Sequence, residues 1–376
     1  MRIVSVVGTR PQLIKAAALQ GPLHARHDGV LVDTGQHWDD EMAGGFFAEL
    51  ALAPPAYSLR AGGGSHAEQT AAMLTGLEPI LAAERPDAVL VYGDTNSTLS
   101  GAIAAAKAGI PVAHVEAGLR SFDRRMPEEI NRVVADHLST WLFAPTRTAV
   151  ENLRAEGITR GVSLVGDLMQ DLVAGVANAS RQAGLLAAIG RDLGGRFADC
   201  LVPRGYVFAT VHRQENRSPL AVRSWADILA RIAEPDRPVV LALHPGTAEA
   251  VRRAGVQLGP DVLVSRPQAY RASIALQLHA AAVVTDSGGI QREAAWLGVP
   301  CLVLRESTEW PELLEGSGGL SAIVGLDPER AVRAFARVVR SAPGPDGSEP
   351  AEGREVRPAG AAEAIALALD VVPPGA

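Results

Sequence analysis

The sequence is poor in cysteine and has no long hydrophobic run. Cys200 and Cys301 are its two cysteines, too few for a disulfide framework, so we expect a reduced, cytoplasmic protein. Cys301 lies in the apolar string VPCLVL and is expected to be a small core residue. No apolar run is long enough to span a bilayer, and the first expected strand starts directly after Met1. We therefore expect neither a signal peptide nor a membrane partner.

Positive charge is also scarce. The formal net charge is −7 at pH 7, and no cluster of Lys and Arg occurs, so nothing supports binding to nucleic acid or to a membrane surface. An anionic ligand must therefore be held by local groups.

Several common site motifs are missing. The scattered histidines and acids lack the spacing of HExxH or CxxC, so we expect no metal and no cofactor. The Ser-Gly-Gly string at 287–289 does not form GxSxG, which argues against a serine hydrolase. Neither GxGxxG nor a Walker A motif follows the first expected strand, which argues against a dinucleotide or ATP site there.

Short apolar runs alternate with helical segments along most of the chain. RIVSVVG, GVLVDTG, RPDAVLVYG, IPVAHVEAG, WLFAPT and GVSLVGD are expected strands in the first half. YVFATVHR, PVVLALHP, DVLVSRP, AAVVTDSGG and PCLVLRES continue the pattern in the second. Runs without polar alternation indicate buried parallel sheets. The sequence therefore predicts an α/β protein of two doubly wound, Rossmann-like domains facing each other across a cleft.

The expected domain boundary lies near residue 170. The rhythm of strands pauses between about 171 and 200, where the sequence favours helices and connections. We expect an N-terminal domain over 1–170, a C-terminal domain over 171–360, and a last helix in 361–376 that packs back on the first domain. The Pro- and Gly-rich stretch 342–360 is expected to be a loop.

In the C-terminal domain, polar groups follow three expected strands. Ser287-Gly288-Gly289 lies between a strand and a helix, where glycine lets a phosphate approach and the free amides of the first helical turn attract it. Glu293, about one turn further, could accept hydrogen bonds from ribose hydroxyls. His212 and Arg213 follow a second strand, and His244 follows a third. A strand–helix turn and structural histidines are the alternatives, but the joint occurrence of these groups favours a nucleotide site.

In the N-terminal domain, carboxylates occupy the corresponding positions. Asp94 and Glu116 end neighbouring strands, and Glu128 and Glu129 follow Pro127 at a helix start. Two carboxylates in one crevice shift each other's pKa and suit proton transfer. Asp94 could instead be a helix cap, and Glu129 is best explained by the helix dipole alone.

Two cations and a histidine complete this set. Arg10 and Lys15 lie at the first strand exit and on the first helix, where they would face phosphate or an anionic sugar group. His37, in TGQHWDDEM, follows another strand and either lines the cleft or orders its loop.

With these strings in order, the chain resembles the non-hydrolysing UDP-N-acetylglucosamine 2-epimerases. The resemblance covers nearly the whole length, through GTRPQLIKAA, TGQHWDDEM, GSHAEQTAAML, YGDTNST, HVEAGLRS, PEEINR, TVHRQEN, DSGGIQREA and RESTEWPE. It implies the glycosyltransferase-B fold, with UDP held mainly by the C-terminal domain. It also implies inversion at C2 through loss of the C2 proton, departure of UDP and re-addition to a 2-acetamidoglucal. We expect a UDP-sugar substrate and a homodimer.

The resemblance assigns roles by motif. It places three functional carboxylates on Asp94, Glu116 and Glu128 and a catalytic histidine on His212. UDP- or phosphate-contacting positions fall on Arg10, Lys15, Ser287, Gly288, Gly289 and Glu293. Which carboxylate removes the C2 proton stays open.

Three positions depart from the usual family pattern. Gln12 stands where many members have Glu, Trp310 where many have Arg, and Arg292 where a second Glu is common. GTRPQ, TGQHWDDEM and TEW together resemble the branch that acts on UDP-diacetamido-uronic acids. The TGQH loop lacks the glutamine-rich continuation of allosteric members, so we do not expect activation by substrate.

Other functions fit parts of the pattern. A glycosyltransferase of the same fold would share the nucleotide site but would not need three converging carboxylates. A hydrolysing 2-epimerase would release UDP and the free sugar. A nucleotide-sugar sensor without catalysis would not need the intact carboxylate set.

Overall fold

The chain divides into two compact units. The computed structural model describes all residues except 37–49, 51, 183, 308–319, 342–359 and 372–376. Unit 1 comprises residues 1–172 with 358–376, and unit 2 comprises residues 173–357. The boundary lies within helix α7 (Leu168–Gln182), two residues beyond the position expected from the sequence.

Unit 1 is a parallel sheet of seven strands in the order β3-β2-β1-β4-β5-β6-β7. Every strand pair in it is parallel. Its elements are β1 (Arg2–Val7), α1 (Arg10–His24), β2 (Asp28–Asp33), β3 (Tyr57–Ser58), α3 (His66–Glu84), β4 (Ala88–Tyr92), α4 (Asn96–Lys107), β5 (Val112–Val115), α5 (Pro127–Leu138), β6 (Trp141–Ala144), α6 (Arg147–Ala155), β7 (Val162–Leu164) and α16 (Ala361–Ala368).

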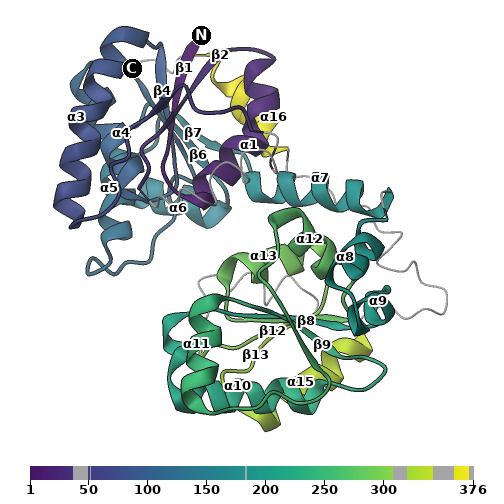
Figure 1. Ribbon diagram of the computed structural model, residues 1–376. Coiled ribbons are helices and arrows are strands. Elements are labelled where there is room, and N and C mark those ends of the chain that lie inside the picture. The colour runs from purple at the N-terminus through teal and green to yellow at the C-terminus, as the bar shows by residue number, and fades with distance from the viewer. Residues whose placement is uncertain (37–49, 51, 183, 308–319, 342–359, 372–376) are drawn as a thin grey trace. The chain divides into compact units, whose positions relative to one another are not determined.

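Helices cover both faces of this sheet, which explains its uninterrupted apolar strands. All residues of β4 and β5 are buried, as expected where both faces are covered. Figure 1 shows α1 and α16 on one face and α3, α4 and α5 on the other. On the first face, Ile365 and Leu369 near the chain's end pack in one core with Leu19 and Leu23 of α1. The last helix is therefore part of unit 1.

Unit 2 is a second parallel sheet, of six strands in the order β10-β9-β8-β11-β12-β13. Besides most of α7 it contains α8 (Leu185–Leu193), α9 (Arg196–Cys200), β8 (Val207–Val211), the 3₁₀ helix η1 (Gln214–Arg217), α10 (Pro219–Ile232), β9 (Val239–Leu243), α11 (Pro245–Ala254), β10 (Val262–Ser265), α12 (Tyr270–His279), β11 (Ala282–Thr285), α13 (Gly288–Leu297), β12 (Cys301–Val303), β13 (Ser321–Ile323) and α15 (Pro328–Ser341).

Helices cover both faces of the sheet of unit 2 as well (Figure 1), and a hydrophobic core lies on each face. One core contains Trp225 and Leu229 of α10 with Phe335 of α15. The other contains Leu186 of α8 and Leu276 of α12. The cysteines are free, and Cys301 is fully buried in β12, so its expected place in the core is confirmed.

The strand order fixes where each unit can hold a ligand. In unit 1 the chain goes from β1 to β2 on one side and returns to β4 on the other side of β1. In unit 2 the same reversal occurs between β8 and β11. In open α/β sheets, ligands bind at the carboxyl ends of strands beside this switch point. The segments after β1, β4, β8 and β11 therefore carry the candidate site.

The predicted fold class, two doubly wound α/β domains, is confirmed. Every apolar run named in the sequence contains a strand of the two sheets. The sequence reasoning missed β3 and β13, which have two and three residues and are too short to give a periodic signal. Stretch 342–360, expected to be a loop, lies outside the described residues apart from its last residue.

In the part of the chain that the structure describes, no single helix is long and apolar enough to cross a membrane. The segments Leu168–Ser180 and Leu185–Leu193 reach the required length and hydropathy only as a pair, and this pair is bent by 81°.

Candidate active site

The predicted carboxylates of unit 1 lie around the switch point of its sheet. Asp94 follows β4 by one turn residue, Glu116 directly follows β5, and Glu128 is in the first turn of α5. Because β4 and β5 are neighbours, their carboxyl ends bring Asp94 and Glu116 to the same edge of the sheet.

Glu116 forms an ion pair with Lys15. Both side chains are about nine-tenths buried, and Gly93 makes their approach possible. A Cβ at Gly93 would lie 3.3 Å from both Glu116 Oε2 and Lys15 Nζ, and Gly93 has a φ of +63°. In the structure Lys15 neutralises this candidate catalytic carboxylate. That Lys15 also faces phosphate or an anionic sugar group stays a prediction.

The backbone of Glu116 is itself unusual. Its φ is +69°, in the left-handed region that favours glycine over residues with a side chain. Non-glycine residues in such conformations cluster at functional sites, where the surrounding structure holds them. The strained backbone therefore supports a functional role for this carboxylate.

Asp94 pairs with a cation of its own. Arg132 Nη2 donates to Asp94 Oδ2 at 2.5 Å, and Arg132 Nη1 donates to Glu129 Oε2 at 2.9 Å. Asn131 Nδ2 also donates to the main-chain oxygen of Asp94. The guanidinium is partly buried, and the Asp94 and Glu129 carboxylates raise its pKa against the effect of burial. Asp94 and Glu116 thus each have an ion pair of their own.

Glu129 anchors a loop. The amides of Ser121 and Phe122 donate to its two oxygens at 2.8 and 3.0 Å, and the side chain is nearly fully buried. Burial acts to raise the pKa of Glu129, but these amides and Arg132 outweigh it and hold the pKa below its usual value. The structural role preferred for Glu129 is therefore supported, through these hydrogen bonds more than through the helix dipole.

Glu128 differs from the other three carboxylates, Asp94, Glu116 and Glu129. Its side chain is partly exposed, and among the described residues it makes no hydrogen bond or ion pair. Protonating Asp94 or Glu116 would break an ion pair, whereas protonating Glu128 breaks none.

A buried network beneath these groups joins the elements that carry them. His114 of β5 contacts Asp136 Oδ1 of α5 through Nδ1, at 2.7 Å, and the main-chain oxygen of Gly93 through Nε2, also at 2.7 Å. Arg120 and the Gly118 amide complete the contacts of Asp136. The network thus ties the β4 turn, the β5 exit and α5 together.

Gln12 gives a physical reason for one departure from the family pattern. Its Oε1 accepts from the Gly8 amide at 2.9 Å, while its Nε2 donates to Tyr92 O at 2.7 Å and to Thr98 Oγ1 at 3.0 Å. An ionised glutamate could not make the two donations. Here Gln12 holds the β1 and β4 exits together. Arg10 begins α1 and is exposed, and His37 and Trp310 lie outside the described residues.

In unit 2, His212 follows β8 and is held by Asp286, which follows β11. The His212 amide donates to both oxygens of Asp286 at 3.1 Å, and the Arg213 amide donates to Oδ2 at 2.9 Å. Asn216 Nδ2 donates to the same oxygen at 2.9 Å. The imidazole itself is 44% exposed, so it is accessible to a substrate.

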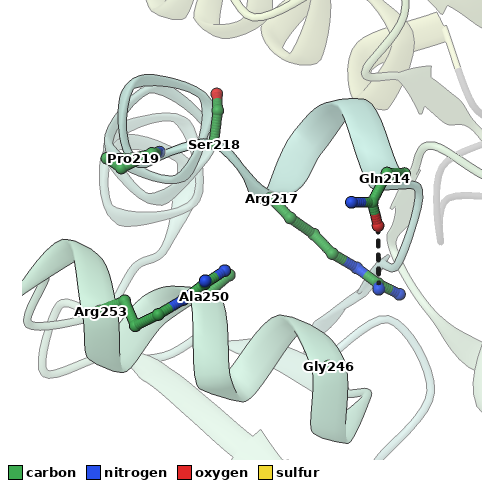
Figure 2. A pocket seen from close by; sticks show the side chains of 7 residues that line it. All are labelled: Gln214, Arg217, Ser218, Pro219, Gly246, Ala250 and Arg253. Carbon is green, nitrogen blue, oxygen red and sulfur yellow. Dashed lines mark hydrogen bonds between the residues drawn. The ribbon is translucent and has the colours of Figure 1, made fainter.

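Arg217 and His244 lie beside this loop. Arg217 donates to the main-chain oxygen of His212 at 2.7 Å and to Gln214 Oε1 at 3.3 Å. Figure 2 shows this guanidinium at one end of a pocket of about 450 Å³ between the starts of α10 and α11, with Arg253 on the α11 side. Burial and the neighbouring cations Arg217 and His212 lower the pKa of His244. His244 Nδ1 accepts from the Gly246 amide at 3.2 Å, so His244 caps α11.

The Ser287-Gly288-Gly289 turn begins α13. Ser287 Oγ accepts from the Ile290 amide at 3.4 Å, so this hydroxyl is the helix cap. A Cβ at Gly289 would meet nothing closer than 3.7 Å, so the turn has open space next to it. Glu293 is buried and accepts from Gln277 Nε2 at 2.6 Å. The start of α13 therefore offers an anion the positive end of a helix dipole and free space.

Sequence reasoning located the strand exits but missed the residues that hold them. Arg132 and Asp286 stand inside quoted motifs, PEEINR and DSGG, yet their partners are far away along the chain. His114 and Asp136 are 22 residues apart. Two features of the sequence could have pointed to these residues: His114 lies within a buried strand, and Asp286 directly precedes the glycine turn. Among the described residues no group of three or more His, Cys, Asp or Glu could hold a metal ion.

Comparison with known proteins shows the family of the chain. The family model described as UDP-N-acetylglucosamine 2-epimerase matches residues 23–356. UDP-2,3-diacetamido-2,3-dideoxy-D-glucuronate 2-epimerase of Pseudomonas aeruginosa is 41% identical over 86% of this chain and 88% of its own. UDP-N-acetylglucosamine 2-epimerase of Methanocaldococcus jannaschii is 37% identical over 89% of this chain and 91% of its own.

A solved structure agrees. The crystal structure of the M. jannaschii UDP-GlcNAc 2-epimerase in complex with UDP-GlcNAc and UDP has a TM-score of 0.80 and 34% identity, and the match covers 98% of this chain and 99% of that one. The chain therefore belongs to the UDP-N-acetylglucosamine 2-epimerase family of isomerases.

Proposed function

We propose that the protein interconverts UDP-N-acetylglucosamine and UDP-N-acetylmannosamine by inversion at C2. The observation that carries the proposal is the set of three carboxylates after β4, after β5 and at the start of α5, which proton transfer at carbon needs. In the proposed reaction a base removes the C2 proton and the C–H electrons form the C1=C2 bond. The C1–O bond breaks, and UDP leaves with its electron pair. The proton then returns to the opposite face of the 2-acetamidoglucal, and a UDP oxygen attacks C1.

Within this proposal, Asp94, Glu116 and Glu128 carry out the proton transfers. Lys15 and Arg132 keep Glu116 and Asp94 in fixed positions, which supports defined geometry relative to the sugar. Glu128 has no such partner among the described residues, and which of the three removes the C2 proton stays open.

Unit 2 is proposed to hold UDP. The start of α13 with Ser287, Gly288 and Gly289 would receive the diphosphate, and Glu293 would accept from the ribose. His212 would act on the reacting groups, and Arg213 and His244 would bind substrate from the same strand ends. Arg10 and His37 are proposed substrate contacts of unit 1. No cofactor is part of the proposal.

The same chemistry on a UDP-diacetamido-uronic acid is the second candidate. The P. aeruginosa relative, 41% identical, is named for that sugar, and the sequence carries Trp310 where many N-acetylglucosamine epimerases carry an arginine. Release of free sugar and UDP, or glycosyl transfer, would need the elimination product or the sugar to be trapped by another nucleophile.

We also infer a cytoplasmic homodimer. The free thiols of Cys200 and Cys301 fit a reducing compartment. The dimer is supported by a groove of about 390 Å³ between α3, α4 and α5. Apolar side chains line this groove, among them Leu74, Leu99 and half-exposed Ile130. Light scattering coupled to gel filtration measures the mass, and a monomer would reject the dimer.

Proton NMR of UDP-N-acetylglucosamine with the protein in D₂O tests the reaction. Appearance of the manno epimer with deuterium at C2 is the expected result. Free N-acetylmannosamine with UDP would move the protein to the hydrolysing class. Absence of exchange, followed by exchange on the diacetamido-uronate, would establish the second candidate.

A further inference from the structure

A fully buried carboxylate, Asp286, joins the two loops of the unit 2 site. It stands between β11 and the Ser287 cap of α13. Its side chain has no exposed surface, and its hydrogen-bond donors, the amides of His212 and Arg213 and the Asn216 side chain, all come from the segment after β8. Asp286 thus belongs to one strand exit by sequence and organises the other by contact.

The charge of Asp286 has an unusual environment. Throughout the described ranges, no Lys or Arg side chain contacts this carboxylate. The ionisable side chain that does is His212, whose Nδ1 lies 3.5 Å from Asp286 Oδ1. A buried carboxylate needs hydrogen bonds or an opposite charge. Three N–H donors satisfy the hydrogen-bonding need, and a protonated His212 would supply the opposite charge.

The peptide group of His212 is fixed on its other side as well. Arg217 Nη2 donates to the His212 main-chain oxygen at 2.7 Å, and Figure 2 shows Arg217 held in turn by Gln214. The amide and the carbonyl of one residue are therefore both restrained, while its imidazole remains 44% exposed. Such an arrangement fixes the backbone from which the ring projects and leaves the ring accessible.

The charged groups around the imidazole come from three elements. Asp286 faces it from the β11–α13 junction, Arg217 lies in η1, and His244 lies at the start of α11, where His212 and Arg217 both act on its pKa. Arg213 is adjacent in the chain and pairs with Glu215 at 3.6 Å. Arg217, and His244 when protonated, oppose a positive charge on His212, and Asp286 favours it.

We propose that Asp286 is a positioning residue that sets the tautomer of His212. Its carboxylate faces Nδ1, so Nδ1 carries the proton in the neutral ring and Nε2 is left to exchange a proton with the substrate. The catalytic consequence rests on the function proposed for His212; the tautomer does not. Asp286 also precedes Ser287, so the same residue keeps the histidine in register with the turn proposed to bind phosphate.

Nitrogen NMR of the protein labelled at histidine tests the proposal without substrate. His212 is assigned from the signal lost in His212→Gln. We expect neutral His212 to carry its proton on Nδ1; a proton on Nε2 overturns the proposal. The tautomer is read from the unaltered protein and His212→Gln serves only for assignment, so the measurement decides even where Asp286→Asn fails to fold.

Asp286→Asn then tests the charge. The substitution keeps an oxygen for the amides but removes the negative charge that faces Nδ1, so we expect the share of neutral His212 with its proton on Nε2 to rise. Asp327→Asn is the matched control, because Asp327 is an exposed cap of α15 in the same unit that accepts from the Arg330 amide at 3.0 Å. An unchanged tautomer ratio of His212 in Asp286→Asn, or an equal change in Asp327→Asn, overturns the proposal.

Turnover provides the last readout. In Asp286→Asn we expect kcat to fall at least about tenfold while KM stays within about threefold, as for loss of general acid–base efficiency. Wild-type turnover in this variant overturns the catalytic role. A protein with the expected tautomer of His212 but no epimerase activity on either UDP-sugar leaves the action of Asp286 on His212 intact and rejects the proposed function instead.

Discussion

The two units use the same kind of parallel sheet and place polar groups at the same kind of switch point, but they compensate charge differently. In unit 1 the carboxylates of Glu116 and Asp94 are paired with side chains, Lys15 and Arg132. In unit 2 the carboxylate of Asp286 is held mainly by main-chain amides. Side-chain ion pairs suit a region that positions acids for proton transfer. Main-chain donors at helix starts suit a region that receives an anion.

The largest expected effect is on kcat, and the prediction separates the chemical step from UDP binding. Asp94→Asn should lower kcat by about 10²- to 10⁴-fold, the usual range for a proton-transfer group, while UDP affinity stays within about twofold. Calorimetric titration with UDP and the D₂O assay measure the two quantities. Asp87→Asn is the control, since Asp87 precedes the other end of β4 and is exposed. Loss of UDP binding in Asp94→Asn would show that Asp94 has a structural role. It would also contradict the assignment of proton transfer to unit 1 and of UDP binding to unit 2.

The next effect concerns the stability of unit 1. Burial acts to raise the pKa of Asp136, but His114 and Arg120 outweigh it and lower the pKa below its usual value. Asp136→Asn should cost about 3 to 5 kcal/mol of unfolding free energy, as for removal of one partner from a buried ion pair. Because the folded pKa lies below the unfolded one, this contribution is present above the unfolded value near 3.8 and is lost as pH falls through the folded value.

Urea unfolding at neutral pH and at successively lower pH measures this contribution. Glu156, which pairs with Arg120 from a partly exposed position, provides the comparison. Glu156→Gln should cost only about 0 to 1 kcal/mol. Equal losses of unfolding free energy in the two variants would show that the buried network stabilises unit 1 no more than a partly exposed ion pair does.

A smaller effect is expected at Gly93. Gly93→Ala adds a Cβ in a left-handed backbone, which costs about 1 to 2 kcal/mol, and places it 3.3 Å from the Lys15–Glu116 pair. Gly109→Ala carries the same backbone penalty, since its φ is +72°, but has nothing within 4 Å. Both variants should lose similar stability in thermal unfolding, and only Gly93→Ala should also lose turnover. Full activity in Gly93→Ala would contradict a precise placement of this ion pair.

The smallest effect tests the anion site of unit 2. Gly289→Ala has room in the fold, so the melting temperature should stay within about 1 °C, while UDP affinity falls about tenfold, equal to about 1.4 kcal/mol. Gly175→Ala in α7, where a Cβ would meet nothing within 4 Å, should leave UDP affinity unchanged. Unaltered UDP affinity in Gly289→Ala would move the phosphates away from the start of α13.

Much of the fold could be predicted because strands such as RIVSVV and AVLVY are buried on both faces and carry a continuous apolar signal. The strand exits could be predicted because polar residues follow these runs at once. The ion pairs could not. Lys15 and Glu116 are 101 residues apart, and their contact depends on the order of strands in the sheet, which periodicity does not encode.

The contacts of Asp286 could not be predicted for the same reason. Asp286 belongs to the motif DSGG, but a carboxylate in a glycine-rich turn is usually explained by the turn itself. Its role depends on β8 and β11 being neighbours, and on an amide pair 73 and 74 residues away.

The left-handed backbone of Glu116 has a consequence for how such a protein can change over generations. At that position glycine would relieve a conformational cost of about 1 to 2 kcal/mol, but it would also leave the buried ammonium of Lys15 without its carboxylate. A change at this position is therefore tolerated only together with a change at Lys15. In related sequences we expect the two positions to vary together.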